Sequence, residues 1–204
     1  MKKIKLNQII TIISFLLFII FFILYLTNKI NIIDEYIYNL IMNLKSDFMT
    51  LFMKIFTFFG SVELTIIIIF ISLILSIFKG KKSIIFVYII VGETILNYII
   101  KILVKRPRPN ILQLVNETSY SFPSGHTMVS VVLYGFLNYL IIKSTINKKL
   151  KISLITILSI IPLLVMISRI YLGVHYFSDV MAGMFLSIAY LLIVIDILER
   201  KKVL

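Results

Sequence analysis

The chain has 204 residues, of which 60% are hydrophobic, a mean hydropathy of +1.07 and no cysteine. So apolar a composition excludes an ordinary soluble domain, and the lack of cysteine excludes disulfides, thiol nucleophiles and thiolate metal sites. The net charge of +12 lies mainly in short segments between apolar runs, which argues against nucleic acid as a partner. We therefore predict an all-α integral membrane protein in which residues 1–204 form a single membrane-embedded domain.

Six segments of the chain are long and apolar enough to cross a bilayer, which takes about 20 residues in a helix. They are residues 8–26, 62–78, 83–104, 127–142, 152–170 and 180–198. The basic residues 1–5 resemble the start of a signal peptide, but the bulky residues 26–30 offer no small-residue cleavage site. We therefore expect the first segment to stay in place as a spanning helix.

Residues 31–59 combine helical spacing of apolar side chains with frequent polar ones, among them Asp34, Glu35 and Asp47. That polarity is too high for a spanning segment but suits a helix that lies in the membrane interface. We predict an interfacial helix on the outer membrane surface after the first span.

The distribution of basic residues predicts the orientation of the chain. Thirteen of the 21 Lys and Arg residues lie at the two ends of the chain and around residues 79–82 and 143–151. Cytoplasmic segments of membrane proteins carry such an excess of positive charge. Both termini are therefore predicted to be cytoplasmic, with the loops that contain the two histidines outside.

The third span carries Glu93, Asn97 and Lys101 at intervals of four residues, so their side chains project from one side of the helix. Ionisable groups inside a membrane are costly unless they face a bundle interior or a wet cavity, which makes them candidates for function. An alternative for Glu93 and Asn97 is that they only bond neighbouring helices. In either case the row leads toward Lys101 at the outer end of the span.

Polar residues suited to binding phosphate gather at the outer ends of the predicted spans. They are Lys101, Arg108, Ser124, Gly125, His126, Arg169, His175 and Asp179. Ser124 and Gly125 open a helix, where free amide hydrogens and the helix dipole attract anions. An ordinary helix cap at Ser124 is the alternative. Three cations beside a helix start predict a phosphate site.

His175 and Asp179 are four residues apart, so the carboxylate can hold one ring nitrogen and leave the other as a nucleophile or base. The alternative is a structural histidine with a capping aspartate. Two histidines and an aspartate are also metal ligands, but the neighbouring Lys and Arg residues repel a divalent cation and attract phosphate. We therefore predict no metal and no cofactor.

Three blocks of sequence resemble the signature of the type 2 phosphatidic acid phosphatase family of membrane lipid phosphatases. From Lys101 to Pro109 the chain has Lys, six residues and Arg-Pro; residues 123–126 are Pro-Ser-Gly-His; and residues 168–179 have Ser-Arg, five residues, His, three residues and Asp. All signature positions are filled. The plan of six spans resembles the family over nearly the whole chain.

The resemblance implies a metal-independent phosphoryl transfer in two steps. His175 would attack phosphorus and form a phosphohistidine while Asp179 orients its ring, and His126 would protonate the leaving oxygen and later activate water. The groups implied to hold the phosphate oxygens are Lys101, Arg108, Arg169, Ser124 and the Gly125 amide.

The family also implies a substrate and a place. We expect a lipid phosphate as the partner, at the outer face of a bacterial cytoplasmic membrane, with undecaprenyl diphosphate as first choice, phosphatidylglycerophosphate second and phosphatidic acid third. A different class of function is a non-catalytic binder or transporter of lipid phosphates, suggested by Glu93 and Asn97 within the membrane. Transfer of the phosphoryl group to an acceptor lipid is a further alternative.

Overall fold

The computed structural model describes residues 6–79, 82–110 and 112–202 of the chain. Within these ranges the protein is all-helical, with eight helices and no strand. The six long helices are α1 (Leu6–Leu26), α4 (Val62–Lys79), α5 (Lys82–Val104), α6 (Gly125–Lys143), α7 (Lys148–Tyr171) and α8 (Phe177–Arg200). They match the six predicted spans to within four residues at each end, so the predicted fold class is confirmed. The basic residues 1–5 and 81, used for the predicted orientation, lie outside the described residues.

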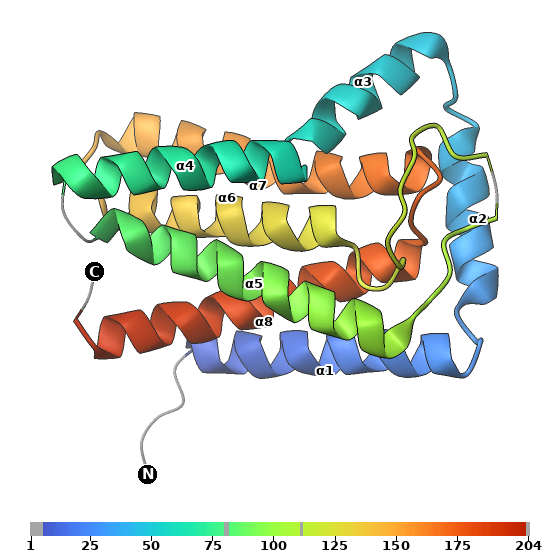
Figure 1. Ribbon diagram of the computed structural model, residues 1–204, viewed down its shortest axis with the longest axis horizontal. Helices are drawn as coiled ribbons and strands as arrows, with labels where there is room; N and C mark the ends of the chain where they lie inside the picture. Colours follow the sequence, from blue (N-terminus) through green and yellow to red (C-terminus); the bar gives the residue numbers. More distant parts are fainter. Residues whose placement is uncertain (1–5, 80–81, 111, 203–204) are drawn as a thin grey trace.

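The stretch predicted as one interfacial helix forms two, α2 (Asn31–Met42) and α3 (Asp47–Phe58). Ser46 separates them: its backbone is extended, and its side chain accepts a hydrogen bond from the amide of Met49, which starts a new helix. Figure 1 shows α2 lying across the ends of the long helices, whereas α3 slopes back toward the start of α4. The helix that follows the first span therefore covers one end of the bundle.

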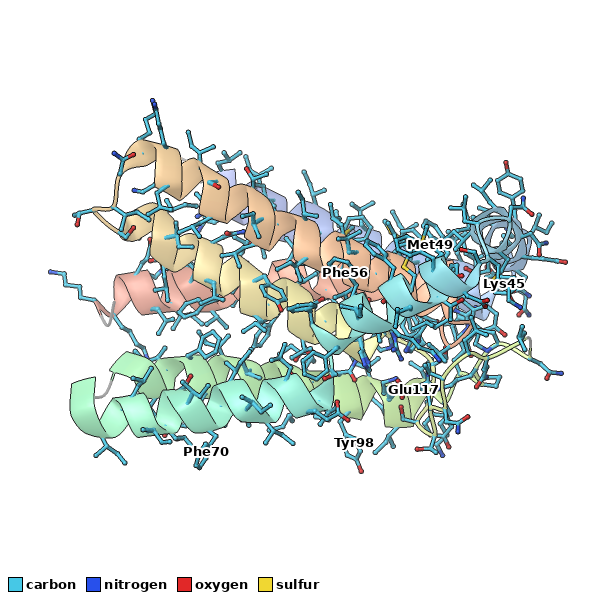
Figure 2. The ribbon with its side chains drawn as sticks, turned by 90° about the horizontal axis from the view of Figure 1, so that it is seen from above. Lys45, Met49, Phe56, Phe70, Tyr98 and Glu117 are labelled. Carbon is cyan, nitrogen blue, oxygen red and sulfur yellow. The ribbon has the colours of Figure 1, made fainter. Side chains whose placement is uncertain are left out.

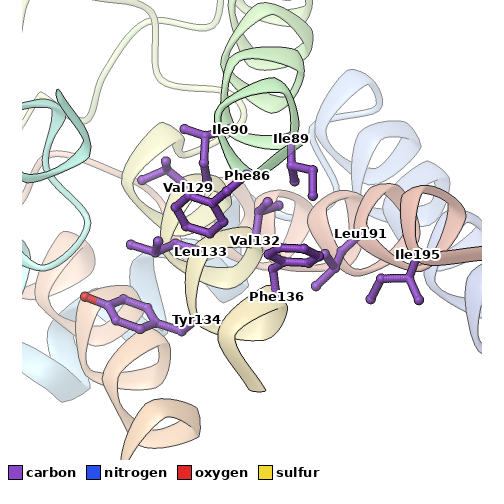
Figure 3. Packing of buried hydrophobic residues seen from close by; sticks show 10 residues of the cluster. All are labelled: Phe86, Ile89, Ile90, Val129, Val132, Leu133, Tyr134, Phe136, Leu191 and Ile195. Carbon is purple, nitrogen blue, oxygen red and sulfur yellow. The ribbon is translucent and has the colours of Figure 1, made fainter. Parts of the chain in front are cut away.

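The core of the bundle is formed by α6, which packs against α5, α7 and α8. Figure 3 shows Phe86 of α5, Val132 and Phe136 of α6 and Leu191 of α8 gathered in this core. In a membrane such contacts stabilise the fold by close packing rather than by removing apolar surface from water. The packing fixes the first turn of α6, where His126 stands, relative to α5 and α8.

The outward faces of the helices are apolar, as contact with lipid requires. Figure 2 shows Phe70 of α4 and Tyr98 of α5 pointing away from the bundle, and both side chains are exposed. Polar side chains are instead concentrated at the end where α2, α3 and the long segment between α5 and α6 meet. A chemical site is therefore expected at that end.

Candidate active site

Two loops build the candidate site at the α2 end of the bundle. In the loop from α5 to α6, the amide of Leu114 donates to the carbonyl of Leu172 at the end of α7 (3.0 Å), and the amide of Ser124 donates to the carbonyl of Asp179 in the first turn of α8 (3.1 Å). Gly173 closes α7 with φ +71°, a conformation that glycine adopts without strain. The amides of Val174 and His175 then both point at the carbonyl of Arg169. These bonds fix where the His175 ring lies.

His175 is buried, with its two ring nitrogens in different surroundings. Its Nε2 lies 3.2 Å from Arg108 Nη1, and its Nδ1 lies 3.3 Å from Ser121 Oγ and 3.5 Å from Asp179 Oδ2. Because a guanidinium can only donate, Nε2 is the acceptor and Nδ1 carries the proton. Burial, followed by the positive charges of Arg169 and Arg108, lowers the pKa of His175 well below its ordinary value. Its neutral form, with a lone pair on Nε2, is therefore favoured.

Asp179 is fully buried and serves both the helix and the histidine. Its Oδ2 accepts hydrogen bonds from the amide of Tyr176 (2.9 Å) and from the hydroxyl of Ser121, while its Oδ1 accepts one from Arg106 (2.6 Å). The bond to Tyr176 is a helix cap, so the capping alternative describes part of what Asp179 does. The same oxygen faces His175 Nδ1, as the predicted pairing requires.

His126 and His175 line a common cavity of about 420 Å³, together with Lys101, Arg108 and Gly125. His126 stands in the first turn of α6, and its Nδ1 lies 3.9 Å from Glu117 Oε1. The structure thus brings the two predicted catalytic histidines to one space. Their individual roles stay predictions.

Two of the three predicted phosphate-binding cations, Lys101 and Arg108, line this cavity, and the buried Arg169 pairs with Glu117, which also lines it. Arg108 donates to the carbonyls of Ser119 and Val174, both at 2.7 Å, and Arg169 donates to Thr57 Oγ1 at 2.6 Å. Lys101 donates to the carbonyl of Tyr120. Arg169 Nε is buried and has no hydrogen-bond partner among the described residues. Carbonyl, hydroxyl and carboxylate oxygens therefore accept from these cations, and the Nε of Arg169 is a donor left over.

Ser124 and Gly125 occupy the predicted position at the start of α6. The Ser124 hydroxyl accepts a hydrogen bond from the amide of Thr127 and so caps the helix. Its side chain therefore has the role that the alternative of an ordinary helix cap gave it. A Cβ on Gly125 would lie 3.1 Å from Asn97 Oδ1, which shows how closely α5 approaches here. The amides of Ser124 and Thr127 are already paired, so those of Gly125 and His126 are the ones left for an anion at this helix start.

Asn97 and Glu93, which precede Lys101 on α5, differ from it in their contacts. Asn97 Nδ2 donates to the carbonyl of Pro123 at 3.2 Å, so it bonds a neighbouring segment as the alternative held. Glu93 is buried and lines the same cavity, and its Oε2 has no hydrogen-bond partner within the described ranges. No contact between Glu93 and the phosphate-binding cations is seen among the residues that the structure describes.

Glu117 is the most informative residue that the sequence patterns did not single out. Its carboxylate pairs with Arg169, lies 3.4 Å from Arg108 Nη2 and approaches His126. It thus lies between two of the cations that are predicted to bind phosphate. One signal was available: Glu117 is the only acidic residue between Lys105 and Ser124, in a segment rich in cations. Ser121, Arg106 and Asp34 were also missed.

Comparison with known proteins identifies the family. The model of the PAP2 superfamily matches residues 82–202, which is more than half of the chain. The chain belongs to the PAP2 superfamily. Phosphatidylglycerophosphatase B of Bacillus subtilis is 38% identical over 112 residues, covering 54% of this chain and 55% of that protein. Phosphatidylglycerophosphatase B of Haemophilus influenzae is 33% identical over 93 residues, covering 43% and 36%. The chain thus spans about half or less of the length of these curated relatives.

Solved structures support the same assignment over more of the chain. A PAP2-type phosphatidylglycerolphosphate phosphatase from Bacillus subtilis matches with a TM-score of 0.86 and 29% identity, covering 93% of this chain and 96% of that one. LpxE from Aquifex aeolicus matches with a TM-score of 0.62 and 27% identity, covering 78% and 92%. The predicted resemblance to the family is therefore confirmed.

Proposed function

We propose that this protein is a lipid phosphate phosphatase that acts through a phosphohistidine on His175. One observation carries the proposal: His175 presents Nε2 to a cavity lined by Lys101, Arg108 and His126, while Asp179 supports its other nitrogen. A neutral imidazole backed by a carboxylate and surrounded by cations is suited to attack on a phosphate. Membership in the PAP2 superfamily supports the same reaction.

The shape of the cavity supports a substrate that stays in the membrane. From the charged end the cavity continues between α4 and α5, where Ile66, Ile69, Val91 and Ile95 line it. Ile66 and Ile95 are exposed on the lipid-facing surface. A head group would lie among the cations while its hydrocarbon tail remains between these helices or in lipid.

The reaction follows in two steps. In the first, His175 Nε2 forms a bond to phosphorus, the bond from phosphorus to the lipid oxygen breaks, and His126 gives that oxygen a proton. In the second, His126 takes a proton from water, the water oxygen bonds to phosphorus, and the bond to Nε2 breaks to release inorganic phosphate. Lys101, Arg108 and Arg169 stabilise the charge on the phosphate oxygens in both steps.

The substrate order proposed now differs from that expected from the sequence. Both curated relatives, and the solved Bacillus subtilis structure, carry names that refer to phosphatidylglycerophosphate. We place this lipid first and undecaprenyl diphosphate second. The excess of basic residues on the opposite side of the membrane supports a site that faces the periplasm or cell exterior.

A phosphate-release panel tests the proposal. Purified protein in lipid nanodiscs is given phosphatidylglycerophosphate, undecaprenyl diphosphate or phosphatidic acid, with and without EDTA, and His175→Asn is the matched control. We expect release of inorganic phosphate, fastest from phosphatidylglycerophosphate and unchanged by EDTA, with a loss of about three decades or more in the control. No release from any of the lipids by folded protein would favour the non-catalytic binder. Loss of activity in EDTA would indicate a metal-dependent mechanism. Phosphate recovered on an acceptor lipid would indicate transfer of the phosphoryl group instead of hydrolysis.

A further inference from the structure

A chain of buried charges runs from α2 to the proposed catalytic pair. Asp34 Oδ2 accepts a hydrogen bond from Arg106 Nη2 at 2.8 Å, and Arg106 Nη1 donates to Asp179 Oδ1 at 2.6 Å. The three side chains are exposed by only 2%, 4% and 0% respectively. Buried charges in such close contact interact strongly and are held in one geometry.

Arg106 is fixed on every side. Its guanidinium carbon lies 4.5 Å from the ring centroid of Tyr25 and 4.0 Å from that of Tyr176, and its Nη1 also donates to Ser178 Oγ at 2.7 Å. The guanidinium is thus held between two aromatic faces, where cations are attracted. It cannot leave Asp179 without losing these contacts.

Asp34 anchors the same assembly to the start of α8. Its Oδ1 accepts from the amide of Ser178 at 2.8 Å, and its Oδ2 accepts from the Ser178 hydroxyl at 2.7 Å. Burial raises the pKa of Asp34, and the hydrogen bonds from Ser178 and Arg106 oppose that shift. Three donors directed at one carboxylate stabilise its charged form. A residue of α2 thereby holds the helix turn from which Asp179 projects.

These contacts divide the two oxygens of Asp179 between two tasks. Oδ1 is bound by Arg106, so the carboxylate cannot rotate, and Oδ2 is left to face His175. Arg106 also compensates part of the negative charge of Asp179, and Asp34 in turn compensates Arg106. The charge that acts on the His175 ring therefore depends on all three residues.

We propose that Arg106 and Asp34 are positioning residues of the reaction, which fix the rotation of Asp179 and set how much of its charge His175 experiences. The proposal rests on the phosphatase function proposed above. Arg106 is none of the signature positions, and Asp34 lies outside residues 82–202, which the family model matches. The other ionisable groups around His175 come from α2, α5, α6, α7 and the loops before α6 and α8, and stay unchanged in the test: Glu35, Tyr38, Lys101, Arg108, Glu117, His126, Arg169 and Tyr176.

The test compares the acidic limb of kcat/KM between variants on one substrate, so that the ionisation of the substrate is common to all and a shift reports His175 in the free enzyme. In Arg106→Gln the loss of a positive charge stabilises the imidazolium, so the limb should move to higher pH by roughly half a unit or more. In Asp34→Asn the loss of a negative charge should move the limb to lower pH. We also expect kcat to fall about 10- to 100-fold in Arg106→Gln, because Asp179 is no longer held. Arg106→Lys keeps the positive charge and should return the acidic limb of kcat/KM to its wild-type pH.

Opposite shifts are the decisive result, because damage to the fold alone would not produce them. Limbs that move in the same direction, or not at all, would overturn the proposal. Asp47→Asn removes the same charge from an exposed position at the start of α3, outside the cavity that Asp34, Arg106 and His175 share, and should leave the acidic limb in place. If Arg106→Gln does not fold, the direction of the shift in Asp34→Asn decides. Phosphate release by the wild type separates the two proposals: an active wild type with unmoved limbs contradicts only this one.

Discussion

His126 stands at the start of α6, where its ring faces the cavity that also contains His175. A lipid alkoxide is a poor leaving group unless it receives a proton, whereas a nitrophenolate leaves without one. We therefore expect His126→Ala to lower kcat on a lipid phosphate about 10²- to 10⁴-fold, and much less on a nitrophenyl phosphate ester. Steady-state rates on the two substrates provide the measurement. Equal losses on both would contradict a role of His126 as the acid.

Glu117 places a carboxylate among the cations that are proposed to bind phosphate. An incoming phosphate has to displace it, because two anions cannot share the same arginines without strong repulsion. When Glu117 is replaced by Gln, both Arg108 and Arg169 lose their carboxylate partner. Vanadate and inorganic phosphate should then inhibit roughly tenfold more strongly, a gain of about 1.4 kcal/mol in binding free energy. Inhibition constants measure this, with Glu35→Gln as the control for charge. An unchanged or higher inhibition constant for vanadate in Glu117→Gln would show that Glu117 does not compete with phosphate.

At the scale of single residues, the signature positions could be predicted because each has a fixed place in a short motif. The residues that support them could not. Ser121 lies 58 residues from its partner Asp179, and Arg106 lies 72 residues from Asp34. No local pattern connects residues so far apart, and only the folded chain brings them together.

Among the helices, the close approach of the turn between α3 and α4 to α6 and α7 depends on Gly60. A Cβ at this position would lie 2.7 Å from the carbonyl oxygen of His126 and 2.8 Å from Val165 Cγ1. Gly60→Ala should therefore shift the first turn of α6 and lower kcat about tenfold to 100-fold, since small misplacements at a reacting centre are costly. Gly135→Ala is the matched control, because its Cβ would meet only the flexible side chain of Leu191, at 2.6 Å, in the core away from the site.

Kinetics and thermal unfolding of the two glycine variants separate the effects. Gly60→Ala should lose activity more than stability, and Gly135→Ala should lose stability more than activity. The same loss of activity in both would show that Gly60 has no special connection with the site.

Most helices could be predicted from hydropathy alone, because a bilayer imposes a minimum apolar length on every span. The division between α2 and α3 was missed because apolar residues keep helical spacing across residues 31–59. Ser46 followed by Asp47 was the available signal for a new helix start, since both residue types favour the first turn. Hydropathy does not show that α2 crosses the end of the bundle, because that depends on the contacts of Asp34.

For the molecule as a whole, orientation in the membrane is the main prediction still to be tested. The chain has no cysteine, so Thr118→Cys and Thr145→Cys each introduce a single exposed thiol at opposite ends of the bundle. In intact cells an impermeant maleimide should label Thr118→Cys, and should label Thr145→Cys only after the membrane is opened. The reverse pattern would place the site in the cytoplasm and change the lipids that can reach it.

The class of the molecule followed from composition and three motifs, whereas its preferred lipid did not. The residues that line the cavity between α4 and α5, Glu93 among them, are brought together only in the folded protein, so the sequence pattern does not give the space open to a lipid. The names of the relatives moved phosphatidylglycerophosphate ahead of undecaprenyl diphosphate. The release panel decides between them.

A phosphohistidine on His175 is the direct consequence of the proposed reaction, and it can be trapped. Protein is mixed with a lipid carrying labelled phosphate, quenched in alkaline detergent and mapped by peptide. We expect label on His175 that is stable in alkali and lost in acid. It should be absent in His175→Asn and increased in His126→Ala when the substrate has a good leaving group. Label on another residue, or full hydrolysis by His175→Asn, would contradict the proposed reaction.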